Sequence, residues 1–379
     1  MRLGIILHDF ALGGTERIAV RLAEAWTKAG ASVEIFCGSS SGPIRSMVSP
    51  DVRVVEANPP IPRGMGSLRR LARAAARHFA IHNVEAVFVP GNFHWPVIAE
   101  LAKIKQGQRP AIIAKISSAL RKQERTGLRQ LYFEARSRRR LAHADAIIAL
   151  SDQTAREARA ILRRPVEVIR SPVLPDDPRA TRPVPEGDPL IVAAGRFVHQ
   201  KDFITLVEAF GRIHHPTANL AIVGDGPQFR QVVNRIRTLG LEQRICLPGY
   251  FPDIRPWLDR CRLFVLSSLH EGYPAVIVEA LAAGRPIVAT DCTPASSELL
   301  RDETIGTVVP IADPAALANA LDMMLERPMP DPVAIARNVD AWRIGPISAE
   351  YLELFRSRPG SAQHGESSID QKSEAALSI

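Results

Sequence analysis

Short apolar segments alternate with longer segments whose apolar residues recur at helical spacing, and this alternation runs twice along the chain. In its first passage, the apolar run at 2–7 is followed by a helix-like stretch from Ile18 to Ala29 and a strand-like run at 33–37. A strand, a crossover helix and another strand in this order favour parallel strands with helices on both faces. We therefore predict an α/β protein with two Rossmann-like, doubly wound domains and a cleft between them.

The same pattern predicts individual elements. Further strands are expected at 84–89, 111–116, 146–150 and 166–169 in the first passage, and at 190–194, 220–223, 244–247, 263–267, 287–290 and 307–309 in the second. Helices are expected at 204–213, 228–239 and 340–357. The length of 379 residues is enough for two domains of ordinary size.

A stretch dense in proline separates the two passages. Six prolines lie within 171–189, where they disfavour both helix and central strand. We therefore predict an N-terminal domain at 1–170, a linker at 171–189 and a C-terminal domain at 190–339. A C-terminal helix at 340–358 is expected to return to the first domain. The tail at 359–379 is rich in Ser, Gln, Glu and Gly and is expected to be disordered.

Composition places the chain among soluble proteins of a reducing compartment. It is 46% hydrophobic and 23% charged, and its four cysteines include no C-x-x-C pair that would indicate a zinc site or a disulfide framework. No stretch approaches the roughly 18–20 consecutive apolar residues of a membrane span. We expect a cytoplasmic protein, with peripheral attachment to the inner face of the plasma membrane as a further expectation.

Charge is divided unevenly along the chain. Residues 1–175 hold 28 Lys and Arg against 14 Asp and Glu, whereas the remainder holds 20 against 26. The basic residues of the first half form three clusters, namely Arg69, Arg70, Arg73 and Arg77; Arg121, Lys122, Arg125 and Arg129; and Arg136, Arg138, Arg139 and Arg140. Solvated helix faces explain such clusters, and docking on an anionic membrane is the more specific interpretation.

The second half contains groups suited to a diphosphate. The strand at 190–194 runs into Gly195 and Arg196, and Lys201 and Asp202 follow before a helix. Glycine allows a ligand to approach the backbone, Arg can bind two phosphate oxygens, and Lys is a compact point charge. Each cation taken alone is more typical of a solvated surface. Their position at the end of a strand favours a ligand site instead, since ligands of open α/β sheets bind at that edge.

Two glutamates bracket a second loop of this kind. Glu271 and Glu279 flank a loop at 272–275 that follows the strand at 263–267 and opens a helix. The free N–H groups at a helix start favour an anion. Glu279 is then placed to accept hydrogen bonds from ribose hydroxyls and Glu271 to reach a sugar, while helix capping and a solvated helix face are the structural alternatives.

Three further features occur in loops. The turn at 224–227 lacks a dinucleotide fingerprint because Phe229 occupies the third glycine position, and Asp225 is best interpreted as a turn residue. Gly13, Gly14 and Thr15 join the first strand to the first helix, with Thr15 as a candidate N-cap. His94 follows a strand end; it is a candidate for a catalytic role, although a lone histidine is more often structural.

Together these stretches resemble the retaining glycosyltransferases of family 4 (glycosyl transferases group 1), which have the GT-B fold and use nucleotide-diphosphate sugars. The matching segments are Gly13 to Arg17, Gly195-Arg196 with Lys201-Asp202, Val223 to Pro227, Glu271 to Gly284, and Pro286 to Asp291. They cover most of residues 1–310. They are specific for the family and say little about the substrate.

The resemblance implies a role for each site. Arg196, Lys201 and Glu271 would be catalytic, with the two cations on the leaving diphosphate and Glu271 at the donor hexose, and His94 is added as a further catalytic candidate. The donor-binding residues would be Gly13, Gly14, Thr15, Gly195, Gly224, Gly272, Tyr273, Pro274, Ala275, Val276 and Glu279. The resemblance further implies that the first domain binds the acceptor and the second the nucleotide sugar. Many relatives carry a histidine where this chain has Ser117 and Ser118, which puts the role of His94 in doubt.

The implied reaction moves a hexose, with retention, from a UDP-, GDP- or ADP-sugar to a glycan or lipid-linked glycan acceptor of the polysaccharide or lipopolysaccharide type. No cofactor and no metal are expected, and no D-x-D motif appears. A nucleotide-sugar epimerase of the same fold and a non-catalytic sugar-nucleotide sensor are alternatives. A nucleic-acid-binding protein is suggested only by the net charge of +8, and no aromatic residues interleave with the basic clusters.

Overall fold

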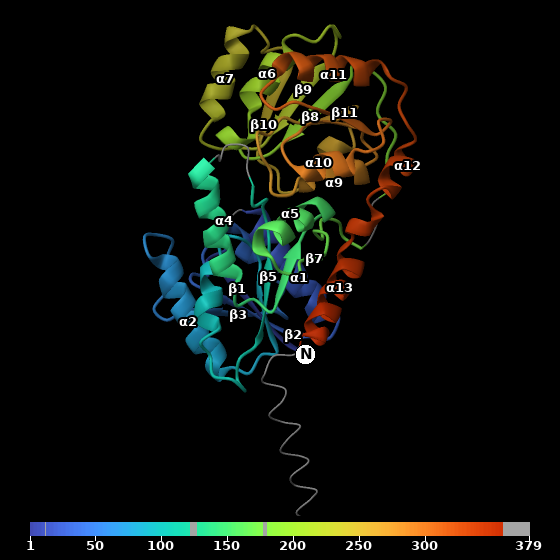
Figure 1. Ribbon diagram of the computed structural model, residues 1–379. Helices are drawn as coiled ribbons and strands as arrows, with labels where there is room; N and C mark the ends of the chain where they lie inside the picture. Colours follow the sequence, from blue (N-terminus) through green and yellow to red (C-terminus); the bar gives the residue numbers. More distant parts are fainter. Residues whose placement is uncertain (12, 122–126, 177–179, 359–379) are drawn as a thin grey trace, which may run out of the picture. The chain divides into compact units, whose positions relative to one another are not determined.

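The computed structural model describes residues 1–11, 13–121, 127–176 and 180–358. The chain divides into two compact units (Figure 1). Unit 1 takes in Met1–Pro172 and the stretch that begins at Ile344, and unit 2 is Val173–Arg343. The tail at 359–379, for which disorder is predicted, lies outside the described residues, as do Lys122 and Arg125 of the second basic cluster.

Unit 1 is built on a parallel sheet of seven strands in the order β3-β2-β1-β4-β5-β6-β7. The strands are β1 (Arg2–Leu7), β2 (Ser32–Cys37), β3 (Arg53–Glu56), β4 (Ala86–Val89), β5 (Ala111–Lys115), β6 (Ala146–Ala149) and β7 (Glu167–Val168). The main helices are α1 (Gly14–Lys28), α2 (Ser67–Ile81), α3 (Ile98–Leu101), α4 (Gly127–Leu141), α5 (Asp152–Leu162) and α13 (Ile344–Ser357), with short 3-10 turns η1 (Pro43–Met47) and η2 (Trp95–Val97).

Helices cover both faces of this sheet. Helices α1 and α13 pack on one face, and α2, α3 and α5 pack on the other. An aromatic cluster joins α1 to α13, with the ring of Trp26 lying 5.7 Å from that of Tyr351 and 5.0 Å from that of Phe355. The last described helix of the chain is therefore part of the core of the first unit (Figure 1).

Unit 2 repeats the plan with a parallel sheet of six strands in the order β10-β9-β8-β11-β12-β13. The strands are β8 (Leu190–Ala194), β9 (Asn219–Val223), β10 (Ile245–Gly249), β11 (Leu263–Leu266), β12 (Ile287–Thr290) and β13 (Gly306–Val309). The helices are α6 (Phe203–Phe210), α7 (Phe229–Thr238), α8 (Arg255–Leu258), α9 (Ala275–Ala282), α10 (Pro294–Leu299), α11 (Pro314–Glu326) and α12 (Pro332–Arg337), with η3 (His199–Lys201) and η4 (Asp340–Trp342).

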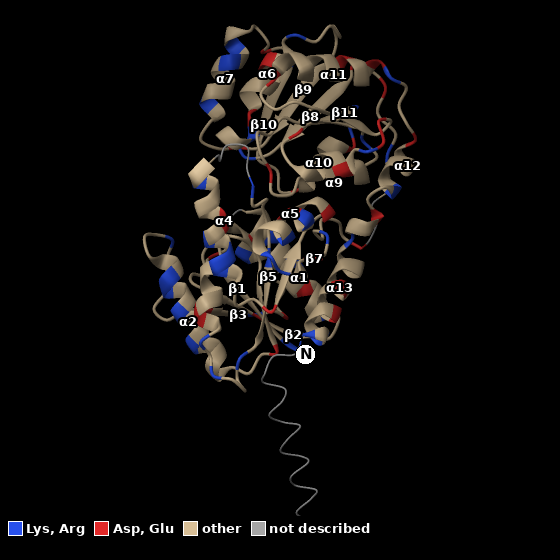
Figure 2. Ribbon diagram, viewed as in Figure 1, with Lys and Arg blue, Asp and Glu red and all other residues tan. Residues whose placement is uncertain are grey.

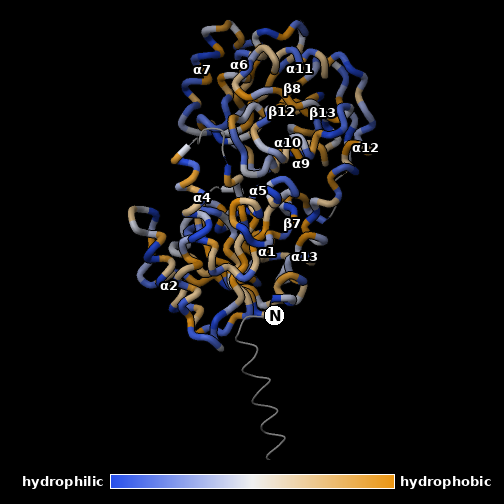
Figure 3. Tube along the Cα trace, viewed as in Figure 1, coloured by the Kyte–Doolittle hydropathy of each residue, from blue (hydrophilic) through white to orange (hydrophobic). Residues whose placement is uncertain are grey.

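The central strands of both sheets are apolar on both faces, as buried parallel strands require. All four residues of β4, β11 and β12 are buried, for example, and Figure 3 shows hydrophobic stretches along the strands of each unit. In unit 2, α6, α7 and α11 contribute to one core, and α8, α9 and α12 to the other.

In each sheet the strand order reverses beside the first strand, which is where open α/β sheets bind ligands. The reversal lies between β1 and β4 in unit 1, and between β8 and β11 in unit 2. The loops that follow β8 and β11 contain Gly195, Arg196, Lys201 and Glu271. The fold therefore carries the predicted diphosphate residues to the expected edge of the sheet.

The predicted fold class, α/β with two doubly wound parallel sheets, is confirmed. One strand was not predicted: β3 has only four residues, and its arginine and glutamate at the two ends are exposed. Such a short edge strand lacks the apolar run on which the prediction depends. The first residues of unit 2 are packed rather than extended into solvent, because Val173 and Leu174 are buried and both donate backbone N–H groups to the carbonyl of Trp342.

Candidate functional site

An ion pair lies at the carboxyl edge of the unit 2 sheet, between the loops after β8 and β11. Lys201 Nζ donates to Oε1 of Glu271 at 2.6 Å, and only 19% and 11% of these two side chains are exposed. Glu271 also accepts a hydrogen bond from Ser268 Oγ at 2.8 Å, and Gln200 Nε2 lies 3.4 Å from its second oxygen. Two residues that are 70 positions apart in the sequence thus meet at one point.

Further hydrogen bonds tie the two loops together. Ser267 Oγ donates to the carbonyl of Lys201 at 2.9 Å, and the N–H of Leu269 donates to the carbonyl of Gln200 at 2.8 Å. From the neighbouring strand, Thr290 Oγ1 donates to the carbonyl of Ser268 at 2.6 Å. Because each loop is held by the other, the Lys201 ammonium group has a defined position instead of moving freely at the surface.

Arg196 provides a second cation at this edge. Its side chain is exposed, and among the described residues it makes no side-chain hydrogen bond or ion pair. The start of α9 lies in the same region and has no side-chain cap, whereas α6 is capped by Asp202, whose carboxylate accepts from the N–H of Thr205. An exposed guanidinium and an uncapped helix start are both suited to an anion.

Two glycine turns bring the backbone of β8 and β9 into direct contact. A Cβ at Gly224 would lie 1.9 Å from the carbonyl oxygen of Gly195, and φ at Gly224 is +147°. A Cβ at Gly195 would meet the Lys201 side chain at 2.9 Å. Asp225 Oδ1 accepts the N–H of Gly226 at 2.7 Å, which confirms Asp225 as a turn residue. Any side chain at Gly224 would force the two turns apart.

The remaining donor candidates of unit 2 lie around the start of α9. Gly272 and Tyr273 precede the helix and are half-buried, and the Tyr273 hydroxyl accepts a hydrogen bond from Trp342 Nε1. Pro274 is the N-cap and is buried, and Ala275 and Val276 form the first turn. Glu279 is a half-buried residue of the second turn and also has an interaction partner.

Cys292 borders the site through its backbone carbonyl, which accepts the N–H of Glu271. Burial raises the pKa of the Cys292 thiol to about 11, and the negative charge of Glu271 adds to this effect. The thiol is therefore neutral near pH 7 and is not a nucleophile.

In unit 1, helix α1 starts at Gly14, two residues earlier than an N-cap at Thr15 predicts. The N-cap is Gly13, so the prediction of Thr15 as N-cap is wrong. The side chain of Glu16 folds back over the helix start, because a Cβ at Gly13 would lie 2.2 Å from its Oε2. Burial raises the pKa of Glu16, although its own backbone N–H and the charge of Arg63 offset part of this effect. A carboxylate three residues into the helix thus takes the place of a capping hydroxyl.

His94 is fully buried beneath the carboxyl edge of β1 and β4. Its Nε2 accepts the backbone N–H of His8 at 3.1 Å, and no described group bonds to its Nδ1. Burial lowers the pKa of His94 to about 3, and the neighbouring His8 and Arg63 contribute to this. His94 is therefore neutral and supports the backbone after β1; its side chain has no exposed surface with which to contact a ligand.

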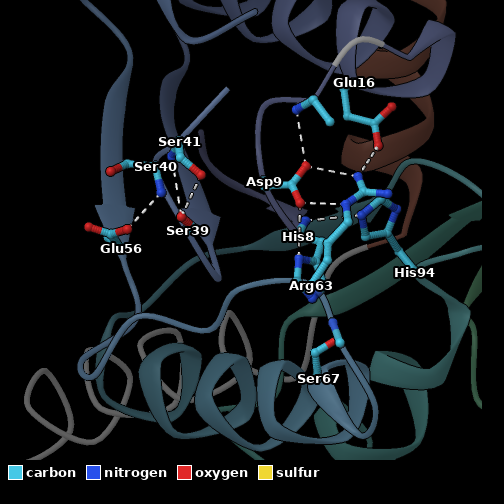
Figure 4. A network of polar contacts seen from close by, with 12 residues as sticks. His8, Asp9, Glu16, Ser39, Ser40, Ser41, Glu56, Arg63, Ser67 and His94 are labelled. Carbon is cyan, nitrogen blue, oxygen red and sulfur yellow. Dashed lines mark hydrogen bonds and ion pairs between the residues drawn. The ribbon is translucent and has the colours of Figure 1, made fainter. Parts of the chain in front are cut away.

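A charged network surrounds this point (Figure 4). Arg63 binds the Asp9 carboxylate with both Nε and Nη2, the latter at 2.8 Å from Oδ1, and its Nη2 also lies 3.2 Å from Glu16 Oε1. Burial alone would raise the pKa of Asp9, but the hydrogen bonds from Arg63 and from the N–H of Ala11 outweigh it and lower that pKa. Two carboxylates thus share one guanidinium.

A shallow hollow opens beside this network. Its lining includes Asp9, Arg63, Ser39 and Ser41, and the hydroxyl groups of the two serines lie 2.9 Å apart. The exposed ring of Phe93 lies against Arg63, with 5.0 Å from the guanidinium carbon to the ring centroid. An aromatic ring, hydroxyls and a fixed charged pair are groups that can contact a polar ligand.

A buried lysine lies under the same edge at the end of β5. Lys115 is 2% exposed, and its Nζ lies 5.8 Å from the centroid of the Phe88 ring. Burial lowers the pKa of Lys115 to about 8, and the charge of Glu16 offsets only part of this effect. The loops that follow β4 and β5 are joined by hydrogen bonds of Asn92. Its Oδ1 accepts the N–H of Ser117, and its Nδ2 donates to Ser118 Oγ.

Sequence reasoning missed Gln200, Ser267 and Ser268 in unit 2, and Asp9 and Arg63 in unit 1. Ser267 and Ser268 directly follow β11, and His8 and Asp9 directly follow β1, so their position at strand ends was a usable signal. Within the described ranges, no group of three or more His, Cys, Asp or Glu side chains could hold a metal ion. No helix among the described residues is long and apolar enough to cross a bilayer.

Two family models match the chain, one in each unit. Residues 13–173 match the glycosyl transferase 4-like domain, and residues 188–327 match the glycosyl transferases group 1 model. The two matches lie on the two sheets described above.

Individual proteins show the same likeness. The lipopolysaccharide core biosynthesis glycosyltransferase LpsE of Rhizobium meliloti is 33% identical over 187 residues, which is 48% of this chain and 54% of that protein. A diphospho-undecaprenol N-acetylgalactosaminyltransferase of Campylobacter jejuni is 28% identical over 37% of this chain and 38% of its own length. The chain thus spans about half or less of the length of these relatives.

Solved structures share the fold over nearly the whole chain. The Anabaena protein HepE in complex with UDP and glucose superposes with a TM-score of 0.76 at 16% identity, covering 94% of this chain and all of HepE. The lipopolysaccharide outer core galactosyltransferase WaaB, in its apo form, gives 0.73 at 17% identity over 94% of this chain and 99% of WaaB. With both domain models matched and this two-domain likeness, the chain belongs to the group 1 (family 4) glycosyltransferases and has the GT-B fold.

Proposed function

We propose that this protein is a retaining glycosyltransferase that moves a hexose from a nucleotide-diphosphate sugar to a glycan or lipid-linked glycan acceptor during synthesis of lipopolysaccharide or another surface polysaccharide. The observation that carries the proposal is the arrangement of cations at the carboxyl edge of the unit 2 sheet. Lys201 is fixed by Glu271, and Arg196 is exposed in the same loop after β8. Relatives named for lipopolysaccharide core and diphospho-undecaprenol substrates support the acceptor class.

In the proposed reaction, Arg196 and Lys201 stabilise the leaving diphosphate. Positive charge that is already in position lowers the barrier because it meets the charge that develops as the bond to the sugar breaks. The uncapped start of α9 adds N–H groups to the same anion, and Glu279 in its second turn holds the ribose. We propose that Gly195 and Gly224 let the donor approach the backbone, with Gly272 to Val276 lining the donor and Gly13, Gly14 and Thr15 contributing from unit 1.

Glu271 then positions the donor hexose. Its Oε1 accepts hydrogen bonds from both Lys201 and Ser268, and its Oε2 faces Gln200, which stabilises the carboxylate and reduces its nucleophilicity. A double-displacement route needs a carboxylate free to attack the anomeric carbon. Same-face attack, with the leaving phosphate taking the acceptor proton, fits this arrangement better.

The nucleotide and the chemistry are testable together. A thermal-shift panel of UDP-, GDP- and ADP-sugars identifies the base, because a ligand at a hundredfold excess over Kd stabilises the folded state by about 2.7 kcal/mol. We expect one nucleotide series to raise Tm and the variant Lys201→Ala to lose that rise. A flat response to all three series would contradict the donor assignment.

Three further measurements address the remaining points. Anomeric analysis of the product by NMR distinguishes retention from inversion, and incubation without acceptor distinguishes transfer from epimerisation, since only an epimerase changes the sugar of the nucleotide. Metal independence is part of the proposal, and we expect unchanged turnover after treatment with EDTA. A loss of activity that Mg²⁺ or Mn²⁺ restores would contradict it.

A further inference from the structure

Helix α4 of unit 1 exposes apolar side chains that the donor site does not use. Leu128, Leu131 and Tyr132 are 84%, 61% and 68% exposed. Spacings of three and four residues place all three on one face of the helix. No other stretch of five residues in the described part of the chain gathers three large exposed apolar side chains.

The opposite face of α4 holds the helix to its unit. Glu134, Ser137 and Leu141 are buried there, and Phe133 packs against the core. The outer side chains therefore contribute little to folding. A monomeric soluble protein gains nothing by keeping them in water, and clustered exposed apolar groups mark interaction surfaces.

Arginines accompany these apolar side chains. Arg129, Arg136 and Arg139 are exposed, and their spacing of seven and three residues sets them on the same side of α4 as Tyr132. Glu134 is the one acidic residue of α4, and it lies on the inner face, paired with Arg121. The outer face of α4 is therefore apolar and positive, with no carboxylate of its own helix.

Helix α2 adds a second row of positive charge on the same side of the sheet. Arg69, Arg70, Arg73 and Arg77 are exposed along it, and both α2 and α4 contact η2. Figure 2 shows basic residues on α2 and α4. The carboxylate of Glu100 nearby interacts with Arg69 and Arg73, but Lys103 is hydrogen-bonded to it and balances its charge, so the row keeps its excess of positive charge.

We propose that the outer faces of α4 and α2 dock on an anionic lipid bilayer. Leu128, Leu131 and Tyr132 enter the boundary between headgroups and acyl chains, and the arginines of both helices contact lipid phosphates. Leucine and tyrosine side chains flanked by arginine suit that boundary. Their apolar parts contact acyl chains, while the tyrosine hydroxyl and the guanidinium groups contact headgroups and water. Nucleic acid offers no apolar layer to leucine. The inference rests on the proposed function in one respect: docking on the bilayer gives the enzyme access to a lipid-linked acceptor.

The test is cosedimentation of the full chain with vesicles of phosphatidylcholine alone and with about one third phosphatidylglycerol, at low and high salt. One variant removes the apolar contacts (Leu128→Ser, Leu131→Ser and Tyr132→Ser together), and another removes charge (Arg129→Gln, Arg136→Gln and Arg139→Gln together). Controls make the same kinds of change at two exposed positions each in unit 2, namely Leu239→Ser with Val333→Ser, and Arg230→Gln with Arg237→Gln on α7.

We expect the protein to bind the anionic vesicles at low salt and to lose this binding at high salt. Each arginine near an anionic surface is worth roughly fivefold in partitioning, so the charge variant falls by about a hundredfold. The apolar variant falls by about tenfold or more, and both controls bind as the parent does. Unchanged Tm values show that the variants are folded.

Three results would overturn the proposal: equal binding to neutral vesicles, equal losses in the unit 2 controls, or an apolar variant that loses self-association in size-exclusion chromatography but keeps vesicle binding. The last would make this face a contact between copies of the chain. The same preparations are tested for stabilisation by nucleotide sugars. Vesicle binding without donor binding refutes the proposed function alone, and donor binding without vesicle binding refutes the docking face alone.

Discussion

The carboxyl edges of the two sheets have the same topology and opposite charge balances. In unit 2, the loop after β8 holds two cations, Lys201 at 2.6 Å from Glu271 and the exposed Arg196. In unit 1, the carboxylates of Asp9 and Glu16 share the single guanidinium of Arg63. The fold brings loops to the same place in both units, but the excess of one charge decides which edge is ready for an anion.

The starts of the helices at these two edges also differ in whether a carboxylate of the protein already faces the positive end of the helix. Helix α1 begins beneath the folded-back carboxylate of Glu16, so its positive end already faces an anion. Helix α9 begins at Ala275 with no side-chain cap. A helix dipole is therefore compensated internally in unit 1 and left for a ligand in unit 2.

The largest expected effect tests the charge excess of unit 2 directly. Replacing Arg196 or Lys201 by Ala should lower kcat by about 10²–10³-fold, because each cation faces charge that develops on the leaving group. The proteins should stay folded, as measured by Tm. The matched control is Arg237→Ala, an exposed cation in the last turn of α7, which should keep the rate of the parent. Near-normal kcat in both cation variants would remove the distinction between the two edges.

A second comparison uses one glycine from each unit. Gly224→Ala should lower the free energy of unfolding by about 3 kcal/mol, because the new Cβ meets the carbonyl of Gly195. Gly14→Ala should change it by less than about 0.5 kcal/mol, since nothing lies within 4 Å of a Cβ there. Urea denaturation measures both.

The same pair of variants separates structure from ligand contact. If Gly14 approaches the donor, its Ala variant keeps its stability and loses about tenfold or more in kcat/KM. A Gly14→Ala enzyme that is unchanged in both measurements would remove this residue from the donor site. A stable Gly224→Ala protein would show that the turns after β8 and β9 can separate, contrary to their contact here.

A third comparison uses the cation buried under the unit 1 edge. The pKa of Lys115 is about 8 when folded and near its usual 10.5 when unfolded, so the unfolded state binds more protons between these values. The cost of burying the charge is present below pH 8 and disappears as the pH rises toward 10.5. Lys115→Met should therefore raise the free energy of unfolding below pH 8 by up to about 3 kcal/mol, and the gain should shrink at higher pH.

Denaturation of both proteins across this range provides the measurement. Burial raises the pKa of Cys37 and Cys261 to about 12, which opposes the trend at high pH. These thiols are present in both proteins, so the difference between the two curves isolates Lys115. The control Lys105→Met changes an exposed lysine and should alter the free energy of unfolding by less than about 0.5 kcal/mol throughout. A constant difference for Lys115→Met as well would show that the amine reaches water.

Much of the fold could be predicted because the buried parallel strands are short apolar runs separated by glycine and proline. Residues 190–194 and 287–290, for instance, were predicted as strands with the bounds that β8 and β12 have. The site could be predicted only in part. Loops that follow parallel strands share one edge, so Lys201 and Glu271 could be placed near each other, but their ion pair depends on loop shapes that periodicity does not describe.

The features that escaped prediction depend on contacts between distant segments. Arg63 lies in a segment rich in proline and glycine, with no periodicity to show that it reaches Asp9, 54 residues away. Thr15 is a candidate cap because hydroxyls commonly cap helices, whereas the side chain that folds back over the helix start is the longer one of Glu16. The role of His94 follows from its complete burial, and no sequence pattern indicates the burial of a single residue in a loop.

The return of the chain to unit 1 has a consequence for the order in which the protein matures. Trp26 is made early, but two of its ring neighbours, Tyr351 and Phe355, belong to α13. During synthesis, all of unit 2 emerges from the ribosome before the core of unit 1 can be completed. The domain that is translated first is thus the last to close, and a nascent chain halted before Ile344 would present a finished second domain beside an unfinished first one.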